Sequence, residues 1–241
     1  MANKGLEAPP GRDPDWGELY LARGSDVPKC RPIYTGDVFS EVTLRTTSGQ
    51  EKKCLVAVLQ HPCSMRRGRT LRERLLVAKL RPFQPLPRDQ WHTNERLMPL
   101  PQLRPELSSN RAHQAVFFED PYVVDSNELN VLNRLACLSE FGGHLLLQRW
   151  MFYSSRLAVP TWQIAQVNEH VYQEAELVET WCEAAIEHGI TLTEAEADVD
   201  NWLSESVGDS SRRQMLQEVG LRSQVRREMR KELKARNYFT G

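Results

Sequence analysis

Hydrophobic and polar positions change their spacing near the middle of the chain, which divides it into a strand-forming part and a helical part. Asp37–Leu44 alternates apolar and polar side chains with a period of two, and Lys53–Gln60 is an almost continuous apolar run. The Gly-containing turn between them predicts a β-hairpin whose second strand is buried on both faces. Ala115–Phe118 and Tyr122–Val124 predict two short strands or one bent strand, and Leu129–Leu138 predicts another.

Two segments of the first part have less regular patterns. Thr70–Leu80 places leucines at helical spacing, which predicts either a short amphipathic helix or a strand with Val77–Leu80 as its apolar end. Residues 82–105 contain six of the 14 prolines, so we expect a functional loop or a wrapping arm there.

After Leu138 the apolar positions recur at helical spacing. Ser139 is a good N-cap for a helix that ends before Pro160, and Gly189 is a stop for the long helix that follows. Gly220 marks a break in the last, basic segment. The predicted helices after the first are a long one from Pro160 or Thr161 to about His188, a shorter one over Thr193–Ser204, and one or two over Ser211–Arg236.

These patterns predict an α+β protein, with an N-terminal bent antiparallel sheet or SH3-like barrel followed by a C-terminal helical module. The β-rich domain covers residues 33–138 and includes the Pro-rich loop 82–105. The helical module covers residues 139–241. Residues 1–32 predict a loosely ordered arm whose Trp16, Leu19 and Tyr20 dock on the body.

Composition excludes several classes of protein. Five cysteines at scattered positions do not form a disulfide framework. The longest apolar stretch, Cys54–Leu59, is far shorter than the roughly 20 residues of a membrane span. The N-terminus lacks the apolar core of a secretory signal. We therefore expect a cytoplasmic protein with no membrane contact.

Charge is unevenly distributed, although the net charge is only −1. Residues 169–211 hold 12 acidic side chains and no Lys or Arg, and residues 212–241 hold nine basic and three acidic side chains. Mutual neutralisation of these helices, within a chain or between chains, is the simplest interpretation. The same charged helices are a candidate surface for homo- or hetero-oligomers.

A second basic cluster has no acidic run close to it in sequence. Its arginines predict contacts with nucleic-acid phosphates, and Trp91 in the following loop is a candidate for stacking on bases. An exposed, solvated face is the alternative. The C-terminal basic helix is the competing nucleic-acid or protein surface, but the acidic stretch is its obvious internal counterpart. The predicted nucleic-acid-binding residues are Arg66, Arg67, Arg69, Arg72, Arg74 and Trp91, and Lys79 and Arg81 complete the cluster.

One local pattern is similar to the Cys-x5-Arg-Ser/Thr loop of cysteine-dependent phosphatases. In that interpretation Cys63 is the nucleophile, Arg69 holds the phosphate, and Thr70 steadies the leaving thiolate. The bulky Arg66 and Arg67 in the loop and the absence of an alternating β/α pattern around it argue against the phosphatase.

No other pattern indicates a catalytic, metal or cofactor site. The sequence has no Cys-x2-Cys pair, no Gly-x-Ser-x-Gly turn and no glycine-rich nucleotide cradle. We therefore expect neither a metal nor a cofactor. A non-enzymatic binding subunit is favoured over an enzyme, because no group of residues supplies nucleophile, base and oxyanion donor together.

The predicted hairpin resembles a known family. Gly36-Asp37-Val38-Phe39 and the run Lys52–Leu59 are similar to the opening of MazF/PemK-type ribonuclease toxins, which implies an SH3-like barrel and makes a ribonuclease a further alternative. Those toxins usually carry Arg-Pro before the second strand, where this chain has Lys53-Cys54. Their catalytic positions therefore cannot be transferred to this chain.

A broader resemblance is to uncharacterised actinobacterial and phage-encoded proteins. It rests on His61–Arg66, Arg134–Ser139 and Leu147–Arg149. Together the two resemblances imply a prokaryotic mobile-element setting such as a toxin–antitoxin, phage or phage-defence system. The expected function is a binding or assembly subunit that contacts nucleic acid or a partner protein through basic surfaces.

Overall fold

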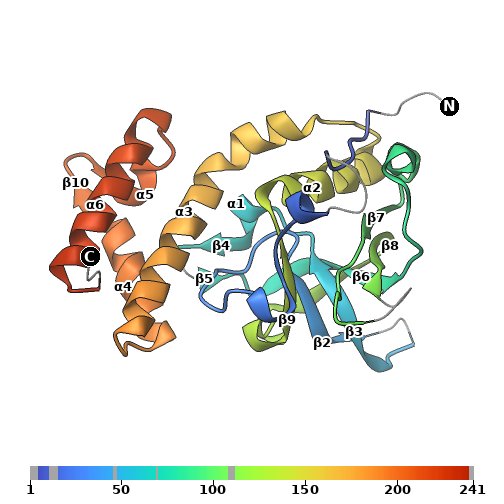
Figure 1. Cartoon of the computed structure of the whole chain (residues 1–241), viewed down its shortest axis with the longest axis horizontal. Helices are drawn as coiled ribbons and strands as arrows, with labels where there is room; N and C mark the ends of the chain where they lie inside the picture. Colours follow the sequence, from blue (N-terminus) through green and yellow to red (C-terminus); the bar gives the residue numbers. More distant parts are fainter. Residues whose placement is uncertain (1–4, 11–15, 46–47, 69, 108–111, 239–241) are drawn as a thin grey trace. The chain divides into compact units, whose positions relative to one another are not determined.

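The computed structural model describes residues 5–10, 16–45, 48–68, 70–107 and 112–238, and Figure 1 labels its helices and strands. The described residues form two compact units. The first takes up the residues up to Val27, Ile33–Met65 and Leu71–Val167. The second takes up Pro28–Pro32, Arg66–Thr70 and the residues from Asn168 onward.

The first unit is built on a seven-stranded antiparallel sheet. Its strand order is β1-β9-β2-β3-β6-β8-β7, which leaves β1 and β7 as edges. The predicted α+β class is therefore confirmed, with an open sheet rather than a closed barrel. The strands are β1 (Tyr20–Arg23), β2 (Val38–Arg45), β3 (Glu51–Val58), β6 (Arg74–Pro82), β7 (Leu97–Leu100), β8 (Gln114–Asp125) and β9 (Arg134–Leu138).

The predicted hairpin is present as β2 and β3. The two strands pair from Val38 opposite Ala57 to Arg45 opposite Glu51. Alternate side chains of β3 enter two different cores: Ala57 belongs to the core that includes α2 (the helix-side core), whereas Val56 and Val58 belong to the core on the other face (the opposite core). The prediction that this strand is buried on both faces is confirmed.

Of the two predictions for Thr70–Leu80, the strand is confirmed and the helix is wrong. β6 pairs with β3 on one side and β8 on the other, and this pairing places Leu75 and Val77 in the opposite core and Ala78 and Leu80 in the helix-side core. A strand buried on both faces is apolar at consecutive positions, so its leucines also fit a helical spacing.

The remaining elements of the first unit are short, apart from one helix. The Pro-rich segment contributes the edge strand β7 and the 3-10 helix η3 (Arg88–Thr93). The two candidate strands around Pro121 form one strand, β8, with an irregular register opposite Ala78–Leu80. The short elements are η1 (Gly17–Leu19), η2 (Gly24–Asp26), α1 (Pro62–Met65), η5 (Ser126–Glu128) and η6 (Val131–Asn133). Two further short strands, β4 (Arg66–Arg67) and β5 (Thr70–Leu71), form a ribbon; β4 belongs to the second unit, and β5 has one residue in each unit.

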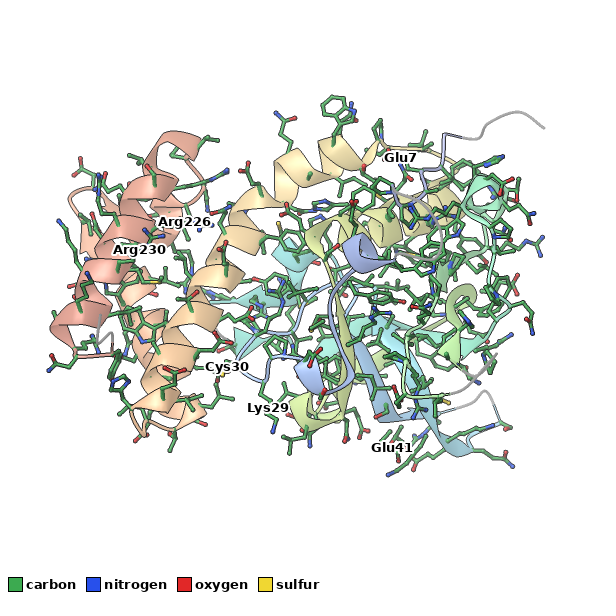
Figure 2. The ribbon with its side chains drawn as sticks, viewed as in Figure 1. Glu7, Lys29, Cys30, Glu41, Arg226 and Arg230 are labelled. Carbon is green, nitrogen blue, oxygen red and sulfur yellow. The ribbon has the colours of Figure 1, made fainter. Side chains whose placement is uncertain are left out.

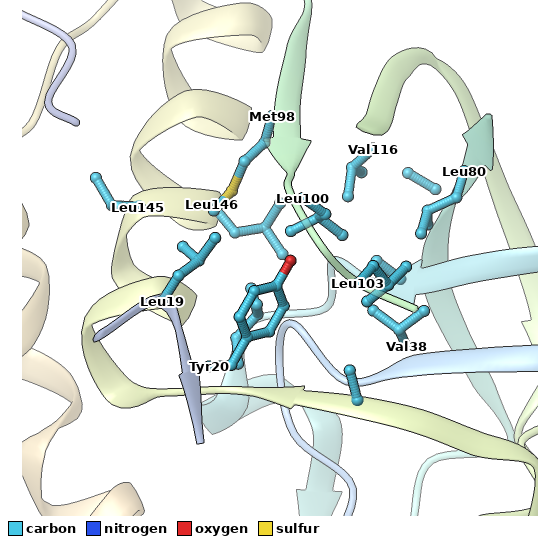
Figure 3. Close-up of a cluster of buried hydrophobic side chains, with 14 of the residues drawn as sticks. Leu19, Tyr20, Val38, Leu80, Met98, Leu100, Leu103, Val116, Leu145 and Leu146 are labelled. Atoms are coloured by element: carbon cyan, nitrogen blue, oxygen red, sulfur yellow. The ribbon is translucent and has the colours of Figure 1, made fainter. Parts of the chain in front are cut away.

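Helix α2 (Glu140–Ser155) belongs to the first unit. Ser139 caps it as predicted, because its Oγ accepts a hydrogen bond of 3.0 Å from the Gly142 amide. Leu145 and Leu146 are fully buried in the helix-side core. Figure 3 shows these two leucines with the strand residues around them. The division between the units therefore falls between Val167 and Asn168, not at residue 138, because α2 covers the sheet.

The N-terminal arm docks on this unit as expected for Trp16, Leu19 and Tyr20, which are all buried in the helix-side core. Arg149 of α2 holds several loops together, and its guanidinium donates to the carbonyls of Glu7, Trp91 and Asn94. Glu7, labelled in Figure 2, also accepts hydrogen bonds from the backbone and side chain of Thr161. Part of the predicted arm, residues 1–4 and 11–15, lies outside the described residues.

The second unit is helical. Its core contains Trp181 and Trp202, whose ring centroids are 5.4 Å apart, and the stripe Val225, Met229 and Leu233 of the last helix. The long helix α3 begins in the first unit and continues into the second. The helices are α3 (Thr161–Glu187), α4 (Leu192–Ser204), α5 (Arg212–Met215) and α6 (Arg222–Ala235), with the strands β10 (Ser206–Val207) and β11 (Ser210–Ser211) and the 3-10 helix η7 (Val219–Leu221) between them.

The described helices match the predicted ones closely, and the break at Gly220 falls in η7. None of the described helices has the length and apolar character needed to span a bilayer.

Candidate nucleic-acid interface

The predicted basic cluster is divided between the two units. Arg66 and Arg67 lie on β4 in the second unit, whereas Arg72 and Arg74 lie in the first unit. Arg69 lies outside the described residues. Among the other members, Lys79 is half-buried on β6, and Arg81 is paired with Asp120 and lies 4.9 Å from the centroid of the Phe117 ring.

Gly68, which follows β4, lies against helix α4 of its own unit. Gly68 has a φ of +59°, and a Cβ at this position would lie 3.0 Å from a carboxylate oxygen of Asp200 on α4. Pro28–Pro32, the other segment from the first part of the sequence in this unit, also contacts an acidic helix, because Arg31 pairs with Glu179 of α3 at 2.9 Å. Although no acidic run is near Arg66 and Arg67 in sequence, the fold therefore places the Asp200 carboxylate close to the end of β4.

Trp91 is not available to stack on a base. Its side chain is fully buried, and its ring stacks on Trp16 at a centroid distance of 5.5 Å. The guanidinium of Arg149 lies 5.4 Å from the centre of the same ring. The indole fills the core of the first unit, so this candidate contributes to packing.

Most arginines of the C-terminal segment are neutralised by the acidic stretch, as the charge pattern predicts. Arg213, for example, binds Glu174 at 2.9 Å and Asp200 at 2.7 Å. The other pairs between the basic segment and the acidic stretch are Arg212–Glu205, Arg222–Glu169, Arg226–Glu176 and Arg236–Asp198. Neutralisation within the chain is therefore confirmed for five arginines.

Four cations of α6 are left over. Arg227, Arg230, Lys231 and Lys234, which we call the α6 ridge, are all exposed. Among the residues that the structure describes, none of the four forms an ion pair, although the positive charge of Lys231 acts on the Glu228 carboxylate of the same helix. Figure 2 labels Arg226, which is paired with Glu176, and Arg230 one turn further along α6.

Helix geometry explains why the ridge is left over. At about 100° per residue, the four ridge side chains fall within roughly one quarter to one third of the circumference of α6. The buried stripe of Val225, Met229 and Leu233 occupies the other side of the helix. The paired cations Arg222 and Arg226 lie closer to this stripe, where they reach the carboxylates of α3.

The ridge was not among the residues singled out from the sequence. Its signal is present nevertheless: once Val225, Met229 and Leu233 are taken as the buried stripe, Arg227, Lys231 and Lys234 fall on the opposite side of the helix, with Arg230 at its edge. That side also includes Ser223, Gln224 and Ala235. What the sequence does not show is which cations the acidic stretch already neutralises, because several of the partners are about 40 to 55 residues away, as for Arg226 and Glu176.

The phosphatase geometry is not formed at Cys63. The residue lies in the four-residue helix α1, and the following residues form the ribbon β4–β5 instead of a loop that leads into a helix. Partial burial raises the pKa of the Cys63 thiol, the opposite of what a thiolate nucleophile needs. Thr70 lies on β5, and Arg69 lies outside the described residues.

The residues that carry the MazF/PemK resemblance have structural roles here. Gly36 has a φ of +88° and packs against Leu138, where a side chain would clash. The buried carboxylate of Asp37 accepts hydrogen bonds from the Tyr34 amide at 3.0 Å and from Arg134 at 2.9 Å. Both residues therefore hold the start of β2.

Neither a metal site nor a known relative indicates a function for this chain. Within the described ranges, no group of three His, Cys, Asp or Glu side chains is placed to hold a metal ion. The chain matches no protein-family model and no curated protein. The significance of the α6 ridge therefore rests on its own geometry and charge.

Proposed function

We propose that the protein is a nucleic-acid-binding subunit without catalytic activity of its own, and that the α6 ridge contacts the phosphate backbone. One observation carries the proposal. Four exposed cations on one face of α6 have no described ion pair, in a unit where the other five C-terminal arginines are each paired with a carboxylate. Cations that are not already neutralised are those that gain most from phosphates, because binding releases counterions from the nucleic acid.

The spacing of the ridge supports a polyanion as the partner. Arg227 and Lys231 are four residues apart, as are Arg230 and Lys234, so each pair consists of like charges on neighbouring turns. Such pairs destabilise a helix by a few tenths of a kcal/mol each. A row of phosphates would remove this repulsion along the whole ridge, whereas a single acidic side chain of a partner protein would remove only part of it.

Charge neutralisation on the ridge is the direct test. We expect the triple variant Arg227→Gln, Arg230→Gln, Lys234→Gln to bind a short fluorescent duplex roughly tenfold more weakly, or worse, in anisotropy titrations at about 50 mM salt. A matched control removes three exposed cations of the first unit with Lys52→Gln, Arg72→Gln and Arg74→Gln. This control also tests two arginines that the sequence singled out.

The two variants give opposite results under the two hypotheses. If the α6 ridge is the contact, the control keeps nearly the affinity of the natural chain. Loss of binding in the control but not in the ridge variant would move the site to the first unit and contradict the proposal. Equal affinities for all three proteins would also contradict it.

The non-catalytic part of the proposal has its own test. Purified protein is incubated with RNA and with a phosphoryl ester, and product formation is followed over time. We expect neither substrate to be consumed. Ester turnover that is lost in Cys63→Ser would favour the phosphatase, and RNA cleavage that is unaffected by this substitution would favour the ribonuclease.

The biological setting rests on the resemblances alone. They suggest a prokaryotic mobile-element, phage or phage-defence system, in which a subunit of this kind would bring a nucleic acid to its partners. The charged helices of the second unit remain the candidate surface for such partners.

A further inference from the structure

We infer that the α6 ridge prefers double-stranded to single-stranded nucleic acid and binds it without reading its sequence. This inference rests on the proposed function, because it names the substrate class of the same site. Two features of the second unit carry it: where its aromatic side chains lie, and which side chains surround the ridge.

The first feature is that the second unit offers no open aromatic platform. Proteins that bind single strands combine cations with exposed aromatic rings, and each stacked base contributes about 1–3 kcal/mol. Tyr172, Trp181 and Trp202 are buried, and Trp181 and Trp202 pack on each other in the core. Tyr238 is half-buried with its ring 5.6 Å from that of His188. No Trp, Tyr or Phe among the described residues of this unit is fully exposed.

The second feature is the chemistry of the ridge itself. All four members are Arg or Lys, and the half-buried amide on the same helix, Gln224, is already bonded to Glu228. Reading a base edge needs side chains whose donors and acceptors are fixed in a groove, whereas phosphates need only positive charge. The ridge therefore positions a backbone without identifying a sequence.

Charge density then favours a duplex. Arg227 to Lys234 spans about 10 Å of helix axis, and a duplex presents one phosphate per about 1.7 Å of its length, twice the density of either strand alone. Four cations in a short row neutralise more closely spaced phosphates on a duplex and release more counterions. The same backbone argument applies to DNA and RNA duplexes, so both are included in the test.

Competition experiments with the full chain test the inference. A labelled DNA duplex is displaced by the same duplex, by a duplex of permuted sequence, by an RNA duplex and by either DNA strand alone. We expect the permuted duplex to compete within about twofold of the original and the single strands to compete about tenfold more weakly. Displacement by the RNA duplex would extend the site to both duplex types, and failure of RNA to compete would restrict it to DNA.

The remaining outcomes show whether the duplex preference alone fails or whether the protein does not bind nucleic acid at all. Single strands that compete as well as the duplex would overturn the preference for duplexes but leave nucleic-acid binding in place. A permuted duplex that fails to compete would overturn sequence independence. No binding of the labelled duplex and of a labelled single strand would overturn the proposed function, and the inference with it. The ridge variant, which keeps the apolar stripe of α6, shows in each case whether the binding measured belongs to this site.

Discussion

The sequence-based interpretation of a residue fails most clearly where the residue's role depends on a partner far away in the sequence. Trp91 lies in the Pro-rich segment that follows the basic cluster and is a reasonable candidate for stacking on bases, but it is stacked on Trp16, which is 75 positions earlier in the chain. Asp37 opens a hairpin that resembles a toxin family, but its carboxylate is bonded to Arg134 in the core. Neither contact is local, so no periodicity or motif indicates it.

His144 of α2 gives a prediction at this scale. Burial, and to a smaller extent the charge of the nearby His61, lowers the pKa of His144 from 6.5 to about 4. Since the unfolded chain binds a proton at higher pH than the folded chain does, this residue contributes stability that is present above pH 6.5 and is lost as the pH falls towards 4. The contribution is about 3 kcal/mol.

The measurement is urea unfolding of the natural chain and of His144→Leu between pH 8 and pH 4. We expect the variant to lose less stability than the natural chain across the window from pH 6.5 to 4. His92→Leu, which replaces a half-buried histidine on η3, is measured alongside as a second histidine-to-leucine substitution. Parallel pH profiles for the natural chain and His144→Leu would contradict the assignment.

At the scale of elements, local signals predicted the helices better than the strands. Ser139 and Pro160 limit the segment that holds α2, and the structure confirms both the cap and the end of the helix. Thr70–Leu80 could not be assigned, because a strand between two others has apolar side chains on both faces and loses the alternation that identifies strands. Its pairing with β3 and β8 decides the outcome, and this depends on residues more than 15 positions away.

Gly142 gives a prediction about how α2 fits against the N-terminal arm. A Cβ at Gly142 would overlap the backbone carbonyl of Leu19, which a small shift of a side chain cannot relieve. We expect Gly142→Ala to lower the free energy of unfolding by on the order of 3 kcal/mol, although alanine favours a helix more than glycine does. Thermal or urea unfolding measures the change.

Gly220→Ala is the matched control, because no heavy atom lies within 4 Å of a Cβ placed there. We expect this substitution to change stability by less than about 0.5 kcal/mol. If Gly142→Ala is as stable as the natural chain, the close contact between α2 and the arm is not as the structure describes it.

For the whole molecule, the uneven distribution of charge is the property that links sequence, fold and proposed function. The sequence predicts that acidic and basic helices neutralise each other, and pairs such as Arg213 with Glu174 and Asp200 confirm it. It could not predict how much positive charge remains, because that depends on which cations face α3 and α4 once the helices are packed. The remainder is the α6 ridge, and it is the basis of the proposal that the protein binds nucleic acid.

The salt dependence of duplex binding tests this claim most directly, because its slope counts the phosphates that the protein neutralises. For the natural chain we expect log K to fall with log salt with a slope of up to about −3.6, which corresponds to four ridge cations at about 0.9 each. The variant Arg227→Gln, Arg230→Gln, Lys234→Gln should reduce the slope by about 2.7, and the first-unit control should leave it unchanged. An unchanged slope in the ridge variant, or binding that does not respond to salt, would contradict the account.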